Sequence, residues 1–226
     1  VIVGTKSTFG KGTVQRFYDM DRLIRNIPEE LKPLGEIKVT TQKYYRINGG
    51  SVQLKGVTPD IILPDSYHYI KTGEQEYKNA MEWTEIEAQE FGQDIWKPKN
   101  LELLRKQSSD RMQHDTISSA IYANAERLKK LRDDTKVSMK LDKYIDVMNQ
   151  REKEAKRFEK LGKEDVNGMT ATNLTTDLEY IQMDSSRIAR NDTWLKNVHR
   201  DFQLNEAMHI IYDLIAMEPA LTQKEN

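Results

Sequence analysis

The chain has 226 residues, of which 35 are Lys or Arg and 36 are Asp or Glu, so its formal net charge at pH 7 is −1. This balance gives no overall positive field and argues against a dedicated nucleic-acid-binding protein. No run approaches the roughly 18 apolar residues of a membrane span. The absence of cysteine excludes disulfides, thiolate metal sites and a thiol nucleophile.

The first residues, Val1-Ile2-Val3-Gly4, are typical of a buried strand that runs into a turn. Neither an initiator methionine nor a signal peptide stands before them. A sequence that opens inside a core strand is expected to be a piece of a larger protein.

The first 65 residues have the composition of strands and turns. β-Branched and aromatic residues over 13–18 predict a strand. Apolar and polar residues alternate over 37–47, and Asn48-Gly49-Gly50 is a strong turn signal. The alternation continues over 52–55, which predicts the return strand of a hairpin.

The rest of the chain has helical periodicity. Apolar residues recur at three- and four-residue spacing over 117–131 and over 137–158, with Asp133-Asp134-Thr135 between them. This pattern predicts two long antiparallel helices packed as a hairpin. Ser108-Ser109-Asp110 supplies candidate N-caps for the first helix, and Gly162 is the expected stop of the second.

Three further segments complete the prediction. A short helix is expected around Tyr77–Trp83, a loop over 163–175, and a last helix over 202–215 that ends before Pro219. The predicted fold class is α+β, with a β-rich segment at 1–65 followed by a mainly α-helical domain at 66–226.

The glycines around Lys11 suggest a phosphate-binding loop, but the pattern does not fit one. Five residues rather than four separate Gly4 from Gly10, and Gly12 stands where a magnesium-binding hydroxyl is required. A strand follows, whereas a phosphate loop opens into a helix. These mismatches argue against nucleotide binding.

Lys11 and Gln15 indicate a different chemistry. Residues i and i+4 of a strand share a face, so the two side chains are expected on one side. A glutamine amide can hold a lysine amine by a hydrogen bond without adding charge, which suits a neutral lysine that acts as a general base. An ordinary surface lysine is the alternative that these residues leave open.

The segment from Val3 to Gln15, VGTKSTFGKGTVQ, resembles the lysine segment of the C-terminal-processing peptidases, which are serine proteases with a Ser–Lys catalytic pair. YYRINGGS at 44–51 and KGVTPDI at 55–61 resemble the end of that protease core. REKE at 151–154 and residues 204–214 resemble one subgroup, the periplasmic tail-specific proteases. The resemblance thus covers essentially the whole chain.

This resemblance implies that Lys11 is the general base, which takes the proton of a serine hydroxyl and later returns it to the leaving amine. Gln15 would orient Lys11 and help to keep it neutral. The nucleophilic serine, the oxyanion hole and a peptide-binding PDZ domain are expected before Val1, so the chain alone is expected to be inactive.

The resemblance also implies a periplasmic location and protein or peptide substrates with apolar C-terminal tails, and it leaves room for an adaptor protein. A non-catalytic helical module that binds partners is the alternative function. Unpaired strand edges in residues 1–65 predict self-association.

The histidines, Asp60 and the tryptophans are expected to have structural roles. The histidines lack metal-ligand spacing, so no metal or cofactor site is predicted. Asp60 is expected to cap a turn through backbone N–H groups, and the tryptophans to anchor a core or a domain interface. The residues are His68, His114, His199 and His209, and Trp83, Trp96 and Trp194.

Overall fold

The computed structural model describes residues 1–90, 92, 97–161, 163, 165–166 and 168–217. These residues divide into two compact units. One comprises the described residues of 1–5, 59–70 and 97–217, and the other comprises those of 6–58 and 71–92. Short strands within the first 62 residues precede a helical remainder, as the α+β prediction requires.

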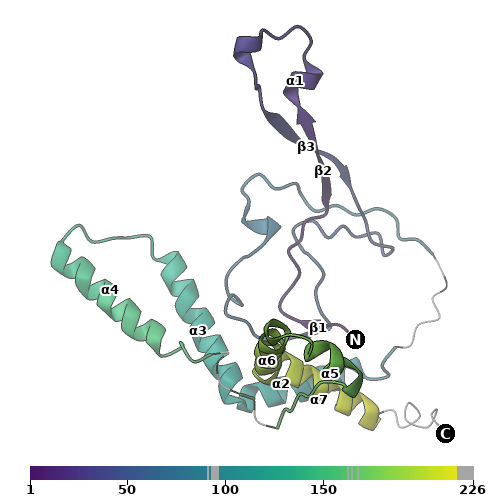
Figure 1. Ribbon diagram of the computed structural model, residues 1–226, viewed down its shortest axis with the longest axis vertical. Helices are drawn as coiled ribbons and strands as arrows, with labels where there is room; N and C mark the ends of the chain where they lie inside the picture. Colours follow the sequence, from purple (N-terminus) through teal and green to yellow (C-terminus); the bar gives the residue numbers. More distant parts are fainter. Residues whose placement is uncertain (91, 93–96, 162, 164, 167, 218–226) are drawn as a thin grey trace. The chain divides into compact units, whose positions relative to one another are not determined.

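The unit of residues 6–58 and 71–92 is built on an antiparallel ribbon of β2 (Thr13–Asp19) and β3 (Glu36–Lys43). The short helix α1 (Met20–Leu23) and a 3-10 turn at Glu29–Leu31 lie between these strands at one end of the ribbon (Figure 1). Both strands were predicted, but their apolar residues do not face a core. Val14, Phe17, Ile37 and Val39 are all exposed.

The predicted return strand at 52–55 is wrong. The turn itself is present, since the Gly49 N–H donates to the Arg46 carbonyl at 2.8 Å. Beyond a single bridge between Tyr45 and Ser51, however, the chain leaves the ladder and closes a tight turn over residues 52–56. The predicted helix around Tyr77–Trp83 is also absent, and only a 3-10 turn, η2 (Glu74–Glu76), lies near it.

In the other unit, β1 (Val3–Gly4) pairs in parallel with β4 (Ile61–Ile62). The expected buried strand over Val1–Val3 is shorter than predicted, and the side chains of Val1 and Ile2 are exposed. Asp60 fixes this pair, because its Oδ2 accepts the Ile2 N–H at 2.8 Å. Asp60 therefore accepts a backbone N–H, as expected, but that N–H belongs to Ile2 before the neighbouring strand and not to the turn that contains Asp60.

The first helical stretch consists of two helices, α2 (Leu101–His114) and α3 (Thr116–Asp133). The predicted N-caps at 108–110 are wrong, because those residues lie inside α2. The caps are Asn100 and Asp115, whose side chains accept the N–H groups of Leu103 and Ser118. A side-chain oxygen near the first turn satisfies a backbone donor that has no partner within the helix.

The predicted break at 133–135 is confirmed: α3 ends at Asp133, and α4 (Leu141–Lys156) runs back alongside it in the opposite direction (Figure 1). Helices α5 (Thr175–Ile181) and α6 (Ser185–His199) were missed, as were α1 and the first part of α2. The last helix, α7 (Phe202–Met217), matches its prediction. Gly162 and Pro219 lie outside the described residues.

The apolar core of this unit lies where α2, α7 and β4 meet. Leu104 and Ile210 are almost completely buried, and Leu63 follows β4 into the same cluster. The buried apolar members of this cluster are Ile61, Leu63, Leu104, Met112, Val166, Met169, Phe202 and Ile210. Among the described residues, no helix is both long and apolar enough to span a membrane.

A charged network joins α2 to α7 beside this core. Arg111 donates to both oxygens of the buried Glu206 and to Asp213, with shortest distances of 2.7 Å to each carboxylate. Burial alone lowers the pKa of Arg111, but the hydrogen bonds and charges of the two carboxylates outweigh it, so that the pKa is raised above the usual arginine value. The guanidinium is therefore a permanent cation in this network.

Arg111→Met is expected to lower the free energy of unfolding by about 3 kcal/mol, because it leaves the buried Glu206 carboxylate without its partner. Urea denaturation measures the loss. The double variant Arg111→Met/Glu206→Met is expected to recover part of it, since no unpaired charge then remains at position 206. Lys129→Met, which breaks an exposed pair with Asp133, is the control and is expected to cost no more than about 0.5 kcal/mol. Equal effects of Arg111→Met and Lys129→Met would contradict the interpretation.

Candidate active-site loop

The loop that carries Lys11, residues 6–12, is called the lysine loop below. It lies so close to the turn at residues 51–57 that backbone contacts backbone. Leu54 N–H donates to the Gly10 carbonyl at 2.7 Å, and Thr8 N–H donates to the Val57 carbonyl at 3.1 Å. A Cβ placed on Gly12 would lie 2.6 Å from the Gln53 nitrogen, so glycine is required there by space alone.

A second segment, residues 73–74, closes on the loop from the start of η2. Glu74 N–H donates to the Phe9 carbonyl at 2.8 Å. Gly73 has a φ of 88°, and a Cβ on it would lie 2.3 Å from the Phe9 carbonyl oxygen. Both the left-handed backbone and the close approach therefore select glycine.

A buried polar pair links these two segments to the lysine loop. The Gln53 side chain is completely buried, and its Oε1 accepts the Gly12 N–H at 2.8 Å. Its Nε2 donates to Glu74 Oε1 at 3.1 Å, and Glu74 is itself only 8% exposed. The amide of Gln53 thus satisfies one donor and one acceptor that would otherwise be unpaired in the interior.

Lys11 and Gln15 line one cavity of about 500 Å³. Both side chains are half-buried. Gln15 Nε2 donates to Thr40 Oγ1 on β3 at 3.3 Å, while no hydrogen bond or ion pair holds Lys11 Nζ within the described part of the chain. The remaining lining residues are Phe9, Thr13, Lys38, Thr40, Glu74, Tyr77, Asn79, Ala80 and Met81.

Neither Gln53 nor Glu74 was predicted from the sequence as part of the site. Strand alternation placed Gln53 on the polar face of a return strand, whereas in the tight turn Gln53 is buried together with Val52 and Leu54 is only half-buried. The Gln-Leu-Lys-Gly run is a weak turn signal, and no local pattern marks Glu74, whose partner lies 21 residues away.

The other singled-out residues hold structural positions. His68 packs edge-on against Tyr69 and Tyr122, and His199 Nε2 accepts the Ala171 N–H at 3.1 Å. Trp83 donates to the Ser51 carbonyl at 2.7 Å, and Lys55 lies over its ring. Trp194 is 56% exposed, so of the two expected positions, a core or a domain interface, the core is excluded for it. Trp96 lies outside the described residues.

No group of three or more His, Cys, Asp or Glu side chains gathers among the described residues in a way that could hold a metal ion.

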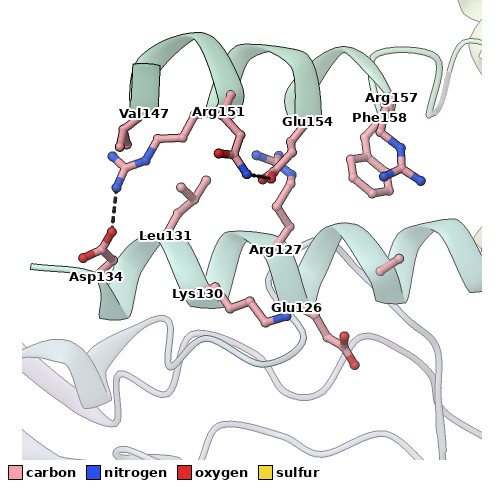
Figure 2. Close-up of a pocket in the computed structure, with 12 residues that line it drawn as sticks. Glu126, Arg127, Lys130, Leu131, Asp134, Val147, Arg151, Glu154, Arg157 and Phe158 are labelled. Carbon is pink, nitrogen blue, oxygen red and sulfur yellow. Dashed lines mark hydrogen bonds and ion pairs between the residues drawn. The ribbon is translucent and has the colours of Figure 1, made fainter. Parts of the chain in front are cut away.

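A second cavity, of about 550 Å³, lies between α3 and α4 (Figure 2). Leu131 and Arg127 point from α3 toward α4, and Arg127 lies 5.5 Å from the centre of the Phe158 ring. Arg151 closes one end through a 2.8 Å ion pair with Asp134. The two helices are thus joined across a gap rather than through a filled apolar seam, and none of the residues of α4 is fully buried.

Residues 151–157 carry mixed charges at helical spacing. Lys156 forms an ion pair with Glu152, one turn earlier in the helix, at 2.8 Å, with both side chains exposed. Arg151 instead faces α3 and reaches across to it.

Comparison with known proteins identifies both parts of the chain. Residues 67–216 match the family described as the C-terminal domain of tail specific protease, and residues 1–63 match Peptidase family S41. The chain belongs to the tail-specific protease family. A tail-specific protease from Haemophilus influenzae (strain ATCC 51907 / DSM 11121 / KW20 / Rd) is 42% identical over 92 residues. This match covers 38% of the present chain and 12% of the Haemophilus protein.

In this tail-specific protease chain, Gly73→Ala and Gly35→Ala test how strictly the lysine loop is held. Both glycines have a φ near 87°, but a Cβ on Gly35 meets nothing within 4 Å. Gly35→Ala is expected to cost about 1 kcal/mol of unfolding free energy from backbone strain alone. Gly73→Ala is expected to cost about 1–3 kcal/mol more, because the new methyl group overlaps the Phe9 carbonyl. Urea denaturation of both variants measures the difference. Equal losses of unfolding free energy would show that Gly73 and the Phe9 carbonyl do not stay in close contact.

Proposed function

We propose that this chain supplies the general base and the C-terminal helical domain of a serine endopeptidase with a Ser–Lys catalytic pair. The observation that carries the proposal is the shared cavity of Lys11 and Gln15, within the segment that matches Peptidase family S41. Residues 1–65 are proposed to belong to the protease core and residues 66–226 to the helical domain.

In the proposed mechanism, Lys11 is neutral before the reaction. Its Nζ takes the proton from a serine hydroxyl, supplied by another part of the enzyme, while the serine oxygen attacks the carbonyl carbon of the scissile peptide bond. As the tetrahedral adduct collapses and the C–N bond breaks, Lys11 returns that proton to the leaving amine. A water molecule, deprotonated by Lys11 in the same way, then attacks the acyl carbon. As the ester C–O bond breaks, Lys11 gives that proton to the serine oxygen, which releases the acid product and regenerates both the serine and the neutral lysine.

Gln15 is proposed to position Lys11 without adding a charge. Its Nε2 is held by Thr40, so its Oε1 remains available to accept a hydrogen bond from the lysine amine. A neutral amide stabilises the protonated lysine less than a carboxylate would, which suits a base that must give up and take up a proton in each cycle.

The proposed substrates are proteins with apolar C-terminal tails, and the proposed location is the periplasm. Both follow from family resemblance, as does the proposal that an adaptor protein assists recognition. The name of the Haemophilus relative describes tail specificity for that protein, and we extend it to this chain as part of the proposal.

A second candidate function is a non-catalytic helical module that binds partners or shapes substrate access. The gap between α3 and α4 favours it, because a cavity of about 550 Å³ is lined there by apolar and charged side chains of both helices. The two functions are compatible within one enzyme, and substitution of Lys11 separates them.

Lys11→Ala in the protease that contains this chain is expected to lower turnover of a peptide with an apolar C-terminal tail by on the order of 10²–10⁴-fold. Lys11→Arg is expected to be equally inactive, since a guanidinium stays protonated and cannot act as a base. Lys6→Ala, in the same loop but exposed, is the control and should retain full turnover. Far-UV circular dichroism checks that each variant is folded.

Retained turnover in Lys11→Ala would contradict the proposal and leave the partner-binding module as the function of the chain. In the same assay, the 226-residue chain alone is expected to show no cleavage, because it contributes the base and not the nucleophile. Cleavage by the chain that a serine-directed inhibitor abolishes would contradict this part.

Self-association is the expected behaviour of the β2–β3 ribbon, whose exposed apolar side chains include Ile37 and Val39. Light scattering of the chain is expected to give a mass above the 26.4 kDa of one copy. Val39→Lys should shift the mass toward a monomer, whereas Gln42→Lys, which adds the same charge without removing an apolar group, should not. A monodisperse monomer of the unmodified chain would contradict this prediction.

A further inference from the structure

We propose that Gln53, supported by Glu74, and Tyr44 are positioning residues that fix the peptide plane between Lys11 and Gly12 and thereby aim the Lys11 side chain. This inference rests on the proposed function, in which Lys11 is the general base. It assigns a role in that reaction to three residues outside the lysine segment.

The first observation is that this one peptide group is held from both sides by side chains. Its N–H, which belongs to Gly12, donates to Gln53 Oε1 at 2.8 Å. Its carbonyl, which belongs to Lys11, accepts the Tyr44 hydroxyl at 2.8 Å. A peptide unit is planar, so two bonds on opposite edges leave it no free rotation.

The plane matters because it begins at the Cα of Lys11. Rotation of the plane changes ψ of Lys11 and, with it, the direction of the Cα–Cβ bond relative to the rest of the loop. A flexible lysine must present its amine within hydrogen-bond distance of the proton that it removes. Fixing the backbone from which the Lys11 side chain extends reduces the number of directions that the amine samples.

The second observation is the arrangement behind Gln53. Its Nε2 donates to the buried Glu74 carboxylate at 3.1 Å, so the amide cannot turn over without losing both bonds. Glu74 in turn donates its own N–H to the Phe9 carbonyl in the lysine loop. Gln53 and Glu74 are therefore each hydrogen-bonded to the lysine loop, Gln53 at Gly12 and Glu74 at Phe9.

The third observation is a strained turn. Leu54 has a φ of 63°, and the Lys55 N–H donates to the Gln53 carbonyl at 2.8 Å, so Leu54 is the centre of a γ-turn. Leucine rarely adopts this conformation. The turn directs the Gln53 side chain inward and also places the Leu54 N–H on the Gly10 carbonyl, two residues before Gly12. Backbone strain of this kind persists where the surrounding contacts over-determine it and is concentrated at functional sites.

Tyr44→Phe tests the carbonyl side of the plane with a minimal change. Tyr45→Phe is the matched control: it removes the hydroxyl of the next residue, which is hydrogen-bonded to Thr84 at 3.0 Å and not to the lysine loop. In the protease that contains this chain, Tyr44→Phe is expected to lower kcat roughly threefold, the value of one modest hydrogen bond, with KM unchanged. Tyr45→Phe is expected to leave both constants at their normal values. Equal effects of the two variants would overturn the role of Tyr44.

Gln53→Met tests the N–H side, since methionine keeps the volume but offers no hydrogen bonds. It is expected to lower kcat roughly tenfold at constant KM. The double variant Gln53→Glu/Glu74→Gln is expected to restore kcat, because the carboxylate at 53 accepts the Gly12 N–H and the amide at 74 donates to it. If Gln53 only fills space, Gln53→Met will match the unmodified enzyme and the inference fails.

Hydrogen exchange of the Gly12 amide supplies a readout that needs no turnover. In the 226-residue chain, this amide is expected to exchange at least roughly tenfold faster in Gln53→Met and to return to its slow rate in the double variant, while amides of β3 stay unchanged. An unchanged exchange rate of the Gly12 amide in Gln53→Met overturns the inference, whatever turnover the Lys11→Ala variant shows. Full turnover in Lys11→Ala overturns the proposed function instead, so the two failures are distinct.

Discussion

The hydrogen bond from the Gly12 N–H to the buried Gln53 side chain is the contact on which the candidate site depends. It joins the lysine loop to the turn at residues 51–57, and through Glu74 it joins both to the segment after Gly73. Without it, a backbone donor and a carboxylate would be buried unpaired, which costs more than the bond itself contributes. The geometry of the loop is therefore maintained by polar satisfaction and not by an apolar core.

The unit of residues 1–5, 59–70 and 97–217 is stabilised in a different way. Apolar side chains of α2 and α7 pack around Leu104 and Ile210, and the Arg111 network closes the seam beside them. Burial of apolar area stabilises without directional demands, so this unit tolerates the gap between α3 and α4. At the lysine loop, by contrast, neither Gly12 in the loop nor Gly73 in the segment packed against it leaves room for a methyl group.

Periodicity predicted the elements whose packing is local and missed those decided by distant contacts. The strands β2 and β3, the break after Asp133 and the last helix follow from short-range patterns. The return strand at 52–55 was wrong because the lysine loop, more than forty residues earlier, competes for its backbone groups. Helix α6 was missed because its side chains are largely solvated and give only a weak apolar stripe.

By itself, the sequence determined the fold class, the resemblance of both parts of the chain to tail-specific proteases, and Lys11 and Gln15 as the residues to examine. Only the tertiary structure decided that Gln53, held by Glu74, accepts the N–H of Gly12 next to Lys11. It also decided that the Tyr44 hydroxyl donates to the Lys11 carbonyl. The physical reason is the range of the interactions. A strand pattern records which residues share a face, whereas a hydrogen bond between segments 33 or 41 residues apart depends on how the whole unit closes.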